Sequence, residues 1–382
     1  MQSGQILEVE AGEGYRVEIA PGLVSDTPEL ARRLSGLLGL ADPSVRAVVV
    51  TDSNVGPLYA EKIGAALEAA RKGALAGVIT IPAGEASKTP GELVRVLEAA
   101  AALGLTRKDA VIALGGGVVG DLAGLAAALY MRGIQCLQIP TSLLAMVDSS
   151  VGGKTAVDLE AGKNLMGVFS QPAGVLIDPE VLQTLPAREI SCGWGEIIKY
   201  AGLDAGVLEA VRRELVQGDA GNEGALAPLP SVGLIARSID VKRRIVSEDE
   251  KESGARRLLN LGHTAGHAVE TASRYELSHG AAVAIGMHIL TKALVIEGRI
   301  PPAMLEELER LLEKAGLPTE VPSALLARPD LDFTVDALLA LARHDKKSAG
   351  AGVHLVLPIA PGRSEVEKVS WEKFREMLEK GL

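Results

Sequence analysis

Short, continuous apolar runs that alternate with helical segments limit what the first half of this chain can fold into. The runs lie at residues 46–51, 77–81, 110–114, 134–139 and 175–178. A strand that is apolar at every position must be covered on both faces, as in parallel sheets whose crossover helices pack on each side. Helices are predicted between the runs, over about 57–71, 90–103 and up to about 131. The pattern therefore predicts a mostly parallel α/β domain, preceded by a β-hairpin within 5–20.

The second half of the chain is predicted to be mostly helical. Helices are expected from Pro186 and over about 229–248, 256–274, 279–297, 301–315, 335–344 and 371–379, with a short β-like piece at 352–357. The change of rhythm falls between 178 and 186, so we expect an α/β domain over 1–182 and a mostly α-helical domain over 183–382. Ligands of such sheets bind at the carboxyl ends of the strands.

Composition argues against several classes of protein. The chain has 39 Lys and Arg against 49 Asp and Glu, and this acidic balance disfavours nucleic acid as a partner. Two cysteines provide no disulfide framework and indicate a reducing compartment. The N-terminus lacks the features of a signal peptide, and the most apolar window, 110–131, contains a glycine run and Asp121, unlike a membrane span. We expect a cytoplasmic protein with neither a membrane nor a nucleic-acid partner.

A glycine-rich turn follows the apolar run at 110–114. Gly115, Gly117 and Gly120 satisfy the spacing G-x-G-x-x-G between a predicted strand and a predicted helix. Glycines let the backbone approach a pyrophosphate, and the helix N-terminus supplies free N–H groups and a positive dipole end. The acid that usually follows about 20 residues later is missing. Asp52, after an earlier strand, takes a comparable position, so a nucleotide is expected to lie across the sheet edge differently.

A long segment rich in glycine and hydroxyl groups follows the run at 134–139. Lys154 stands after two glycines there, in a loose likeness to a P-loop, but Asp148 occupies the position of the first P-loop glycine. We expect Lys154 to contact a phosphate without Walker-type nucleotide hydrolysis. The segment 162–164 adds a further cation and an amide.

Half of the six histidines lie between 263 and 279, and imidazole is a common ligand of divalent transition metals. His263 and His267 are four residues apart, so spacing alone would pair them on one helix face as metal ligands. Arg256 and Asn260 precede them on what is predicted to be the same helix, where they suit an anion near the metal. A solvated surface remains the alternative for the basic clusters.

Several of these motifs together resemble one family. The matching segments are 115–121, 147–155, 162–164, 196–199, 251–252, 256–267, 279–280 and 345–347. Their order and spacing resemble the 3-dehydroquinate synthases, over about residues 45–360. The resemblance implies a Rossmann-like α/β domain followed by an α-helical domain, a fold shared with glycerol dehydrogenases and iron-dependent alcohol dehydrogenases.

The resemblance also implies a reaction. Family members convert 3-deoxy-D-arabino-heptulosonate 7-phosphate to 3-dehydroquinate and phosphate in the shikimate pathway, with NAD and a divalent metal, usually zinc, with cobalt as an alternative. A ring hydroxyl is oxidised to a ketone, phosphate leaves by β-elimination, and the ketone is reduced again. The ring then opens, and an intramolecular aldol step closes the carbocycle. NAD is regenerated in each turnover.

The metal ligands that the resemblance implies differ from the pair suggested by spacing. Glu196, His263 and His279 match the family's ligands, and three ligands with open positions make a Lewis-acid site. His267 matches a histidine placed for proton transfer near the substrate phosphate. Glu252 matches a carboxylate that does acid–base work.

The same matching assigns residues to substrate and cofactor. Groups suited to an anionic, hydroxylated substrate are Lys154, Asn164, Lys199, Lys242, Arg256, Asn260, one of Lys346 and Lys347, and Asp148 on a ring hydroxyl. Positions that match NAD contacts are Asp52, Asn54, Glu85, Lys88, Gly115, Gly116, Gly117, Asp121, Thr141, Ser142, Lys163 and Thr184, with Asp148 and Lys154 also near the cofactor. Arg132 matches an arginine that reaches the neighbouring subunit's phosphate, which implies a homodimer.

The sequence departs from the family pattern in three places. Ser142 replaces a threonine but keeps its hydroxyl, and Gly193, Trp194 and Gly195 replace smaller or more helix-friendly residues before Glu196. Ala281 stands where a glutamate usually follows His279-Gly280, so His279 is expected to be supported in another way.

Three other functions compete with this prediction. Another sugar-phosphate cyclase, of the 2-deoxy-scyllo-inosose or valiolone synthase type, would share the metal and NAD motifs, but Arg256, Asn260 and His267 match the dehydroquinate type. A polyol dehydrogenase of the same fold would release NADH, and the lysine- and arginine-rich site disfavours it. A non-catalytic NAD- and metal-binding module is disfavoured by the complete set of ligands and acid–base groups.

Overall fold

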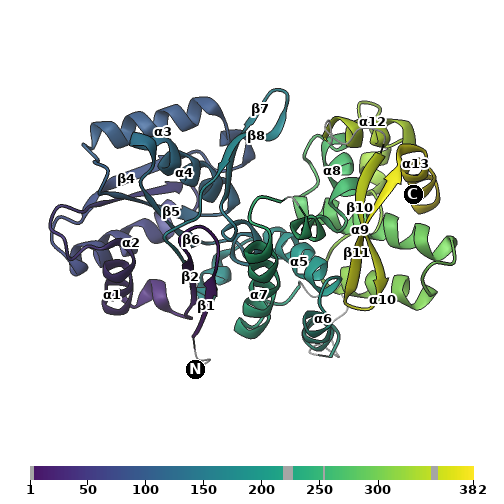
Figure 1. Cartoon of the computed structure of the whole chain (residues 1–382), viewed down its shortest axis with the longest axis horizontal. Helices are drawn as coiled ribbons and strands as arrows, with labels where there is room; N and C mark the ends of the chain where they lie inside the picture. Colours follow the sequence, from purple (N-terminus) through teal and green to yellow (C-terminus); the bar gives the residue numbers. More distant parts are fainter. Residues whose placement is uncertain (1–3, 218–226, 253, 346–351) are drawn as a thin grey trace. The chain divides into compact units, whose positions relative to one another are not determined.

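The computed structural model of the chain describes residues 4–217, 227–252, 254–345 and 352–382. It divides into two compact units, each described here by itself (Figure 1). Unit 1 comprises Met1–Leu185 and Lys242–Glu250, and unit 2 comprises Pro186–Val241 and Lys251–Leu382.

Unit 1 is built on a seven-stranded sheet of order β1-β2-β9-β6-β5-β3-β4. Its strands are β1 (Gln5–Val9), β2 (Tyr15–Ile19), β3 (Ala47–Asp52), β4 (Leu75–Ile81), β5 (Ala110–Gly115), β6 (Gln135–Pro140) and β9 (Gly174–Ile177). The first two strands pair antiparallel as a hairpin, and all other neighbours are parallel. The predicted hairpin and the predicted parallel sheet are both confirmed.

Helices cover both faces of this sheet (Figure 1). They are α1 (Thr27–Leu38), α2 (Gly56–Ala70), α3 (Pro90–Ala102) and α4 (Gly117–Leu129). Val48 and Val50 of β3 and Val111 of β5 pack in one core with α3 and α4, and the alternate residues face α1 and α2. Burial on both sides explains why the central residues of these strands are apolar. No helix is predicted over α1 from the sequence.

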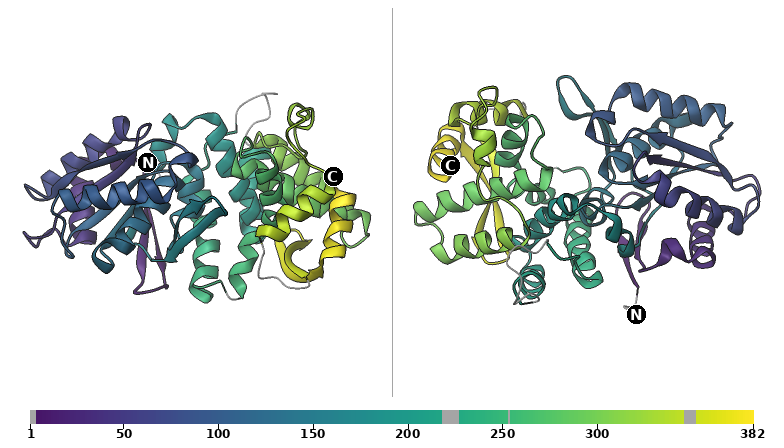
Figure 2. Two further views of the ribbon diagram at one scale, coloured as in Figure 1. Left: turned by 90° about the horizontal axis from the view of Figure 1, so that it is seen from above. Right: turned by 180° about the vertical axis from the view of Figure 1, so that it is seen from behind.

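The segment between β6 and β9 contains structure that the sequence analysis misses. A π-helical turn spans Ala145–Ser149, and β7 (Lys154–Leu159) pairs antiparallel with β8 (Gly162–Phe169) as a separate hairpin that projects from unit 1 (Figures 1 and 2). The long segment rich in glycine and hydroxyl groups therefore contains regular structure that its sequence does not predict. Most residues of β8 are exposed, so the strand lacks the alternation that signals a half-buried strand.

Unit 2 is mostly helical, as predicted. Its helices are α5 (Ala187–Ala201), α6 (Ala205–Val211), α8 (His263–Ala272), α9 (His279–Ile296), α10 (Pro302–Lys314), α11 (Ser323–Leu326), α12 (Val335–Asp345) and α13 (Trp371–Gly381), and α7 (Val232–Glu248) crosses the division between the units. The β-like piece is β10 (Gly352–Ala360), and it pairs with an unpredicted strand, β11 (Arg363–Ser370). Single 3-10 or π turns lie at Leu23–Ser25, Glu85–Ser87, Tyr130–Arg132, Pro179–Thr184, Arg212–Gln217 and Ala255–Asn260.

Helix α9 is the core helix of unit 2. It is long and apolar enough to span a bilayer, but 78% of its apolar window is buried within the protein, as in the core helix of a globular domain. Helices α5, α8 and α13 pack around it. Two glycines make its crossing with α5 unusually close: a Cβ on Gly195 would lie 2.6 Å from the carbonyl oxygen of Gly280. Larger residues at this crossing would push the two helices apart.

The prediction of one continuous helix over 256–274 is wrong. A 3-10 turn covers Ala255–Asn260, the chain turns at Gly262 with φ 76°, and α8 begins only at His263. A Cβ on Gly262 would lie 2.5 Å from Met287 Cγ and 2.7 Å from the Val283 carbonyl oxygen of α9. A positive φ and this close approach both favour glycine, so Gly262 separates Arg256 and Asn260 from the helix that carries the histidines.

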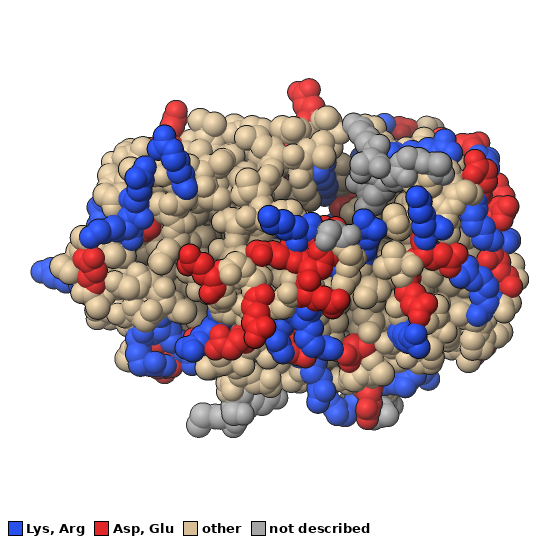
Figure 3. Space-filling model, in the orientation of Figure 1, with Lys and Arg blue, Asp and Glu red and all other residues tan. Residues whose placement is uncertain are grey.

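Charged side chains of both signs are interspersed on the face drawn in Figure 3. Lys and Arg alternate there with Asp and Glu over much of the described surface, in line with the many exposed ion pairs, such as Arg328 with Asp330 and Glu276. Exposed pairs of this kind contribute little to stability, on the order of 0–1 kcal/mol each.

Candidate active site

The glycine-rich turn of unit 1 lies at the topological switch point of the sheet. From β3 the chain moves to β4 at one edge, and it then returns to β5 on the other side of β3. Ligands of open α/β sheets bind where the strand order reverses, at the carboxyl ends of the strands. Asp52 ends β3, and Gly115 ends β5 beside it. The two segments that the sequence analysis links to a nucleotide are thus neighbours.

The turn itself has the features of an anion-binding loop. Helix α4 begins at Gly117, and Gly116 at its N-cap has no side chain to occupy the first-turn N–H groups. Ser142 Oγ would lie 3.4 Å from a Cβ on Gly116, and the Thr141 N–H donates to the Gly115 carbonyl at 2.9 Å. Two hydroxyl residues assigned to NAD therefore lie against the glycine turn.

Further predicted residues of unit 1 form a polar cluster. Lys88 is buried, with Nζ 2.5 Å from Asp121 Oδ2, and it also donates to Asn164 Oδ1. Lys163 pairs with Glu85 at 3.1 Å. The β7–β8 hairpin, which the sequence analysis misses, carries Lys163 and Asn164 to these partners. Five residues assigned separately to cofactor and substrate are thus brought together.

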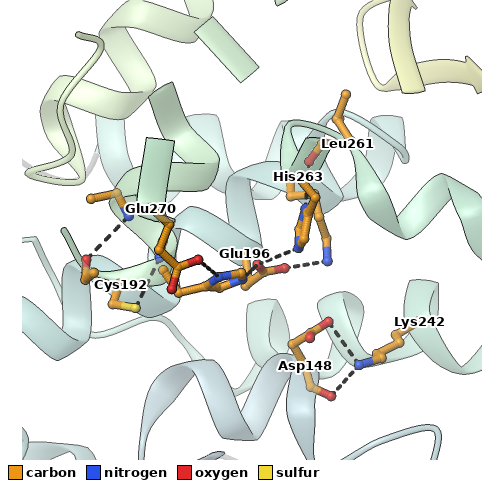
Figure 4. A network of polar contacts seen from close by, with 12 residues as sticks. Asp148, Cys192, Glu196, Lys242, Leu261, His263 and Glu270 are labelled. Atoms are coloured by element: carbon orange, nitrogen blue, oxygen red, sulfur yellow. Dashed lines mark hydrogen bonds and ion pairs between the residues drawn. The ribbon is translucent and has the colours of Figure 1, made fainter. Parts of the chain in front are cut away.

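Asp148 and Lys242 form a second polar pair in unit 1 (Figure 4). Lys242 Nζ donates to the Asp148 carbonyl at 2.6 Å and lies 3.0 Å from its Oδ1. Asp148 lies in the π-helical turn, a local irregularity often found at functional sites. Lys154, at the start of β7, is exposed.

Two other NAD-assigned positions of unit 1 have local structural partners. Asp52 Oδ1 accepts from the N–H groups of Asn54 and Val55 at 2.8 and 2.9 Å, which shapes the turn after β3. Thr184 Oγ1 lies 2.7 Å from the Tyr59 hydroxyl. The hydrogen bonds of the Thr184 side chain go to Tyr59 and to the Val181 carbonyl, away from the glycine turn.

Unit 2 brings together the three predicted metal ligands (Figure 4). Glu196 of α5 is fully buried, and its Oε1 lies 3.1 Å from His279 Nε2 and 3.5 Å from His263 Nε2. One ligand atom of each residue lies within 4.8 Å of the others. One carboxylate and two imidazoles with room for further ligands form a donor set suited to catalytic zinc.

The partners of the Nδ1 atoms of His263 and His279 show that the Nε2 atoms of both residues are available to a cation. His263 Nδ1 lies 3.0 Å from the Leu261 carbonyl oxygen, which can only accept, so Nδ1 carries the proton. His279 Nδ1 lies 3.2 Å from Glu270 Oε2, which fixes the same tautomer when Glu270 is ionised. A metal ion bound between Glu196 and both Nε2 atoms would accept their lone pairs and would replace the proton that His279 carries without metal.

The pKa values of the two predicted histidine ligands, in the absence of a metal, are consistent with a site that holds a positive charge. Burial lowers the pKa of His263 to about 3 despite the nearby Glu196. Burial acts against the charge of His279 as well, but its hydrogen bonds to Glu196 and Glu270 outweigh this and raise its pKa to about 10. A proton on His279 thus balances the buried carboxylates, and His263 stays neutral, the form that binds metal.

Lys199 and Trp194 complete the surroundings of Glu196 on α5. Lys199, one turn further on, forms an ion pair with Glu196 Oε2 and is buried. Trp194 is fully buried, and its indole N–H donates to the Pro228 carbonyl at 2.8 Å. The unusual Gly-Trp-Gly sequence is therefore accommodated, because Gly195 allows the close crossing with α9 and Trp194 fills the interior of unit 2.

His267 lies next to the metal ligands without joining their set. It is one turn after His263 on α8, and its ring centroid lies 5.3 Å from that of His263 and 5.8 Å from that of His279. His267, Glu270 and His279 form a second, alternative group of donors. Spacing predicts His263 and His267 as a ligand pair, but the structure places them in two different three-residue groups of donors that share His279.

The remaining predicted residues of unit 2 precede α8. Arg256 is buried on the 3-10 turn that ends at Asn260, and Asn260 Nδ2 donates to Glu252 Oε1 at 3.1 Å. Glu252 has φ 60°, a backbone conformation that costs a non-glycine residue about 1–3 kcal/mol. Lys346 and Lys347 lie outside the described residues.

Glu270 is the residue near the metal ligands to which the sequence analysis assigns no role. It lies three residues after His267 and seven after His263, a spacing that places all three along one face of α8. That spacing is the signal that could have found it. Its contact with His279 depends on the turn into α9, which the spacing does not show.

Comparisons with known proteins agree with this geometry. Family models described as 3-dehydroquinate synthase N-terminal and C-terminal match residues 78–192 and 193–348. The 3-dehydroquinate synthase of Xanthomonas axonopodis pv. citri (strain 306) is 45% identical over 375 residues, which cover 96% of this chain and 95% of the relative.

Solved structures of two sugar-phosphate cyclases share the fold. The 2-epi-5-epi-valiolone synthase of Streptomyces hygroscopicus subsp. jinggangensis 5008, solved with NAD+ and Zn2+, has a TM-score of 0.80 at 29% identity, with 96% of each chain covered. A 2-deoxy-scyllo-inosose synthase in complex with carbaglucose-6-phosphate, NAD+ and Co2+ has a TM-score of 0.77 at 24% identity, with 99% of this chain and 100% of that chain covered. Both are less similar in sequence than the dehydroquinate synthase relative. The chain belongs to the 3-dehydroquinate synthase family, whose members are phosphate-eliminating lyases of the shikimate pathway.

Proposed function

We propose that this protein carries out the complete family reaction, from 3-deoxy-D-arabino-heptulosonate 7-phosphate to 3-dehydroquinate and phosphate, in the cytoplasm. The observation that carries the proposal is the set of buried Glu196, buried His263 and half-buried His279, with both Nε2 atoms near the same carboxylate. The 45% identity to a dehydroquinate synthase over nearly the whole chain supports this substrate over those of the other cyclases.

Unit 1 would hold the dinucleotide and unit 2 the metal. The glycine turn, the N-terminus of α4 and the cluster around Lys88 suit a pyrophosphate and its riboses. Bound NAD would supply reversible oxidation of a ring hydroxyl, and a bound divalent metal, zinc or cobalt, would lower the pKa of that hydroxyl. Glu196, His263 and His279 would be the metal ligands.

Cationic and amide groups of each unit would bind and orient the anionic substrate. Unit 1 offers Lys154, Asn164 and Lys242, with Asp148 placed by Lys242 to accept from a hydroxyl. Unit 2 offers Lys199, Arg256 and Asn260, and one of Lys346 and Lys347 would add a further cation. Arginine and lysine suit carboxylate and phosphate because they donate charge-assisted hydrogen bonds.

Two residues of unit 2 would move protons. His267 stands beside the ligand set and would exchange a proton with the leaving phosphate. Glu252 is held by Asn260 at 3.1 Å and would act as an acid–base group. Asn164, Glu252 and Arg132 all have positive φ, and backbone strain of this kind clusters at functional sites.

Phosphate release under catalytic NAD tests the proposal. Protein is mixed with the heptulosonate phosphate and a small amount of NAD, and phosphate and NADH are followed together. We expect many equivalents of phosphate and no net NADH, with activity lost to a chelator and restored by zinc. Stoichiometric NADH would identify a polyol dehydrogenase instead. Release from another sugar phosphate alone would identify a different cyclase.

A homodimer with Arg132 acting on the neighbouring subunit is also proposed. Arg132 is exposed at a strained turn, with φ 72°. Leu165 and Phe169 of β8 are 57% and 46% exposed. Exposed apolar residues favour contact with another chain, and a two-fold interface would bury the same surface twice.

Mixing two inactive variants tests the arrangement. If Arg132 acts across the dimer, each mixed dimer of Arg132→Ala and His267→Ala has one complete site, and random exchange recovers about a quarter of wild-type activity. No recovery after demonstrated subunit exchange would place Arg132 on its own subunit's site. A monomer in sedimentation analysis would refute the dimer itself.

A further inference from the structure

His279 is held between two buried carboxylates, one on each ring nitrogen. Glu196 Oε1 lies 3.1 Å from Nε2, and Glu270 Oε2 lies 3.2 Å from Nδ1. Glu196 is fully buried and Glu270 is 6% exposed. When His279 is neutral, as a metal ligand must be, its imidazole has one lone pair and one N–H, so the two carboxylates cannot then have equivalent roles.

The turn between α8 and α9 places Glu270 against His279. The Glu270 carbonyl accepts from Ser273 Oγ at 2.7 Å and from the Tyr275 N–H at 3.0 Å. Arg274 and Tyr275 both have positive φ, with values of 51° and 65°. The chain therefore reverses immediately after α8, and α9 begins at His279 beside the last turn of α8.

Other contacts hold the start of α9 in place. Ser278 caps the helix through the Ala281 N–H, and Cys192 Sγ accepts from the Gly280 N–H at 3.3 Å. These contacts position the backbone of His279 but leave its ring free to rotate. Ala281 has no acceptor to offer the ring. Among the described residues, Glu270 makes the contact with Nδ1 that orients the His279 ring (Figure 4).

We infer that Glu270 is a positioning residue that accepts the Nδ1–H of His279 and thereby directs Nε2 to the metal. This inference rests on the metal site of the proposed function. A carboxylate acceptor also makes the imidazole a stronger donor to the metal than a carbonyl acceptor does. The two histidines therefore differ in how strongly they would bind the metal. His263 Nδ1 donates to the Leu261 carbonyl, whereas His279 Nδ1 donates to the Glu270 carboxylate.

An alternative role for Glu270 follows from the same arrangement of side chains. Glu270, His267 and His279 could themselves bind a metal through His279 Nδ1. A neutral His279 cannot bind metal through Nδ1 and Nε2 at once, so the two arrangements exclude each other. Glu196 is the more buried carboxylate, and the alternative site would leave no metal ion between His263 Nε2 and Glu196 Oε1, which lie 3.5 Å apart.

Zinc affinity of the metal-free protein separates these arrangements. We would measure it by competition with a chromophoric chelator for wild type and for Glu196→Ala, Glu270→Ala, Glu270→Gln, His263→Ala and His267→Ala. Glu306→Ala, on an exposed part of α10, controls for the loss of one negative charge. The absorption spectrum of the cobalt-loaded protein reports the ligand geometry independently of activity.

We expect Glu270→Ala to weaken zinc binding about 10–100-fold and to change the cobalt spectrum. Glu270→Gln keeps a hydrogen-bond acceptor and should therefore retain most of the wild-type zinc affinity. A role that depended only on the negative charge would not predict this retention. His263→Ala should abolish binding, and His267→Ala and Glu306→Ala should leave it unchanged. The unfolding temperature of each metal-free variant shows whether it is folded.

Wild-type zinc affinity and an unchanged cobalt spectrum in Glu270→Ala would overturn the inference. Loss of zinc in both Glu270→Ala and His267→Ala, with retention in His263→Ala, would move the metal to the alternative group. Wild-type affinity in His263→Ala and Glu196→Ala would instead refute the proposed metal site. If Glu270→Ala does not fold, the comparison of Glu270→Gln with wild type decides. A changed cobalt spectrum with a slightly lower zinc affinity supports the inference, and a spectrum and an affinity identical to those of wild type overturn it.

Discussion

The close crossing of α5 and α9 makes Gly195→Ala an informative substitution. A Cβ at this position would lie 2.6, 2.7 and 2.9 Å from the O, Cα and C atoms of Gly280. Non-bonded atoms pack best at about 3.5 Å or more, so the two helices must separate by roughly 1 Å. The obstructing atoms belong to the backbone, which cannot move aside as a flexible side chain can.

The expected cost can be estimated from opposing effects. Overpacking of a core costs about 1–3 kcal/mol, and a clash with backbone belongs at the upper end. Alanine regains about 1 kcal/mol over glycine in helix propensity. We therefore expect a net loss of about 2 kcal/mol, which corresponds to a fall of roughly 4–8 °C in the unfolding temperature of unit 2.

The substitution should weaken metal binding as well, because Glu196 follows Gly195 directly and His279 precedes Gly280. A shift of about 1 Å exceeds the roughly 0.5 Å within which functional groups must be held, so we expect zinc affinity to fall by about tenfold or more. Thermal unfolding of metal-free protein and chelator competition measure the two effects separately.

Gly36→Ala is the matched control. Gly36 lies in α1, and a Cβ there would meet nothing within 4 Å. The same change should therefore raise stability by about 0.5–1 kcal/mol and leave zinc affinity unchanged. If Gly195→Ala is as stable as wild type and binds zinc equally well, the helix crossing does not position the metal ligands, and the argument from close packing fails.

Three further predictions concern other groups. His267→Ala should keep zinc and lose phosphate release by about 100-fold or more, as measured in parallel by metal analysis and steady-state assay, and loss of metal would reassign this histidine. Glu297 is buried, but its ion pairs with Lys373 and Lys380, each at 2.8 Å, hold its pKa below the usual value. The stabilisation of the folded state by ionised Glu297 is therefore present above the unfolded pKa of about 4.3 and is lost as pH falls through the folded pKa. Glu297→Gln should lower the free energy of unfolding by about 1 kcal/mol or less at pH 7 and not at all in acid. A lower unfolding temperature of the variant that persists in acid would contradict this. Burial raises the pKa of the Cys136 thiol to about 12, so it should resist alkylation at pH 8 until the protein unfolds, and rapid labelling of native protein would show that unit 1 opens locally.

The sequence predicts the sheet of unit 1 because its strands are buried on both sides. Val48, Val50 and Val111 belong to runs without polar positions, and such runs are typical of central parallel strands. The site residues follow from motif resemblance, which supplies partners that are far apart in the chain, such as Glu196 and His279. Spacing alone predicts His263 and His267 as paired metal ligands, because both lie on one face of a helix. It carries no information about residues of α5 or α9.

The features that sequence reasoning misses depend on contacts between elements. The break at Gly262 is invisible in the helical pattern of 256–274, because one glycine costs an isolated helix only about 1 kcal/mol. It results from the approach of Met287 and Val283 of α9. The β8 strand shows no alternation because it is exposed, and the role of Glu270 depends on a turn formed by two residues with positive φ.

The break at Gly262 has a consequence for redesign of this enzyme. Arg256 and Asn260 lie on a short turn that ends before α8, whereas His263 and His267 are fixed by the helix itself. The two pairs can therefore be varied independently. Libraries that randomise the turn at Ala255–Asn260 should alter which sugar phosphate is accepted while the metal centre remains assembled, and Gly262 is the position that such libraries must leave unchanged.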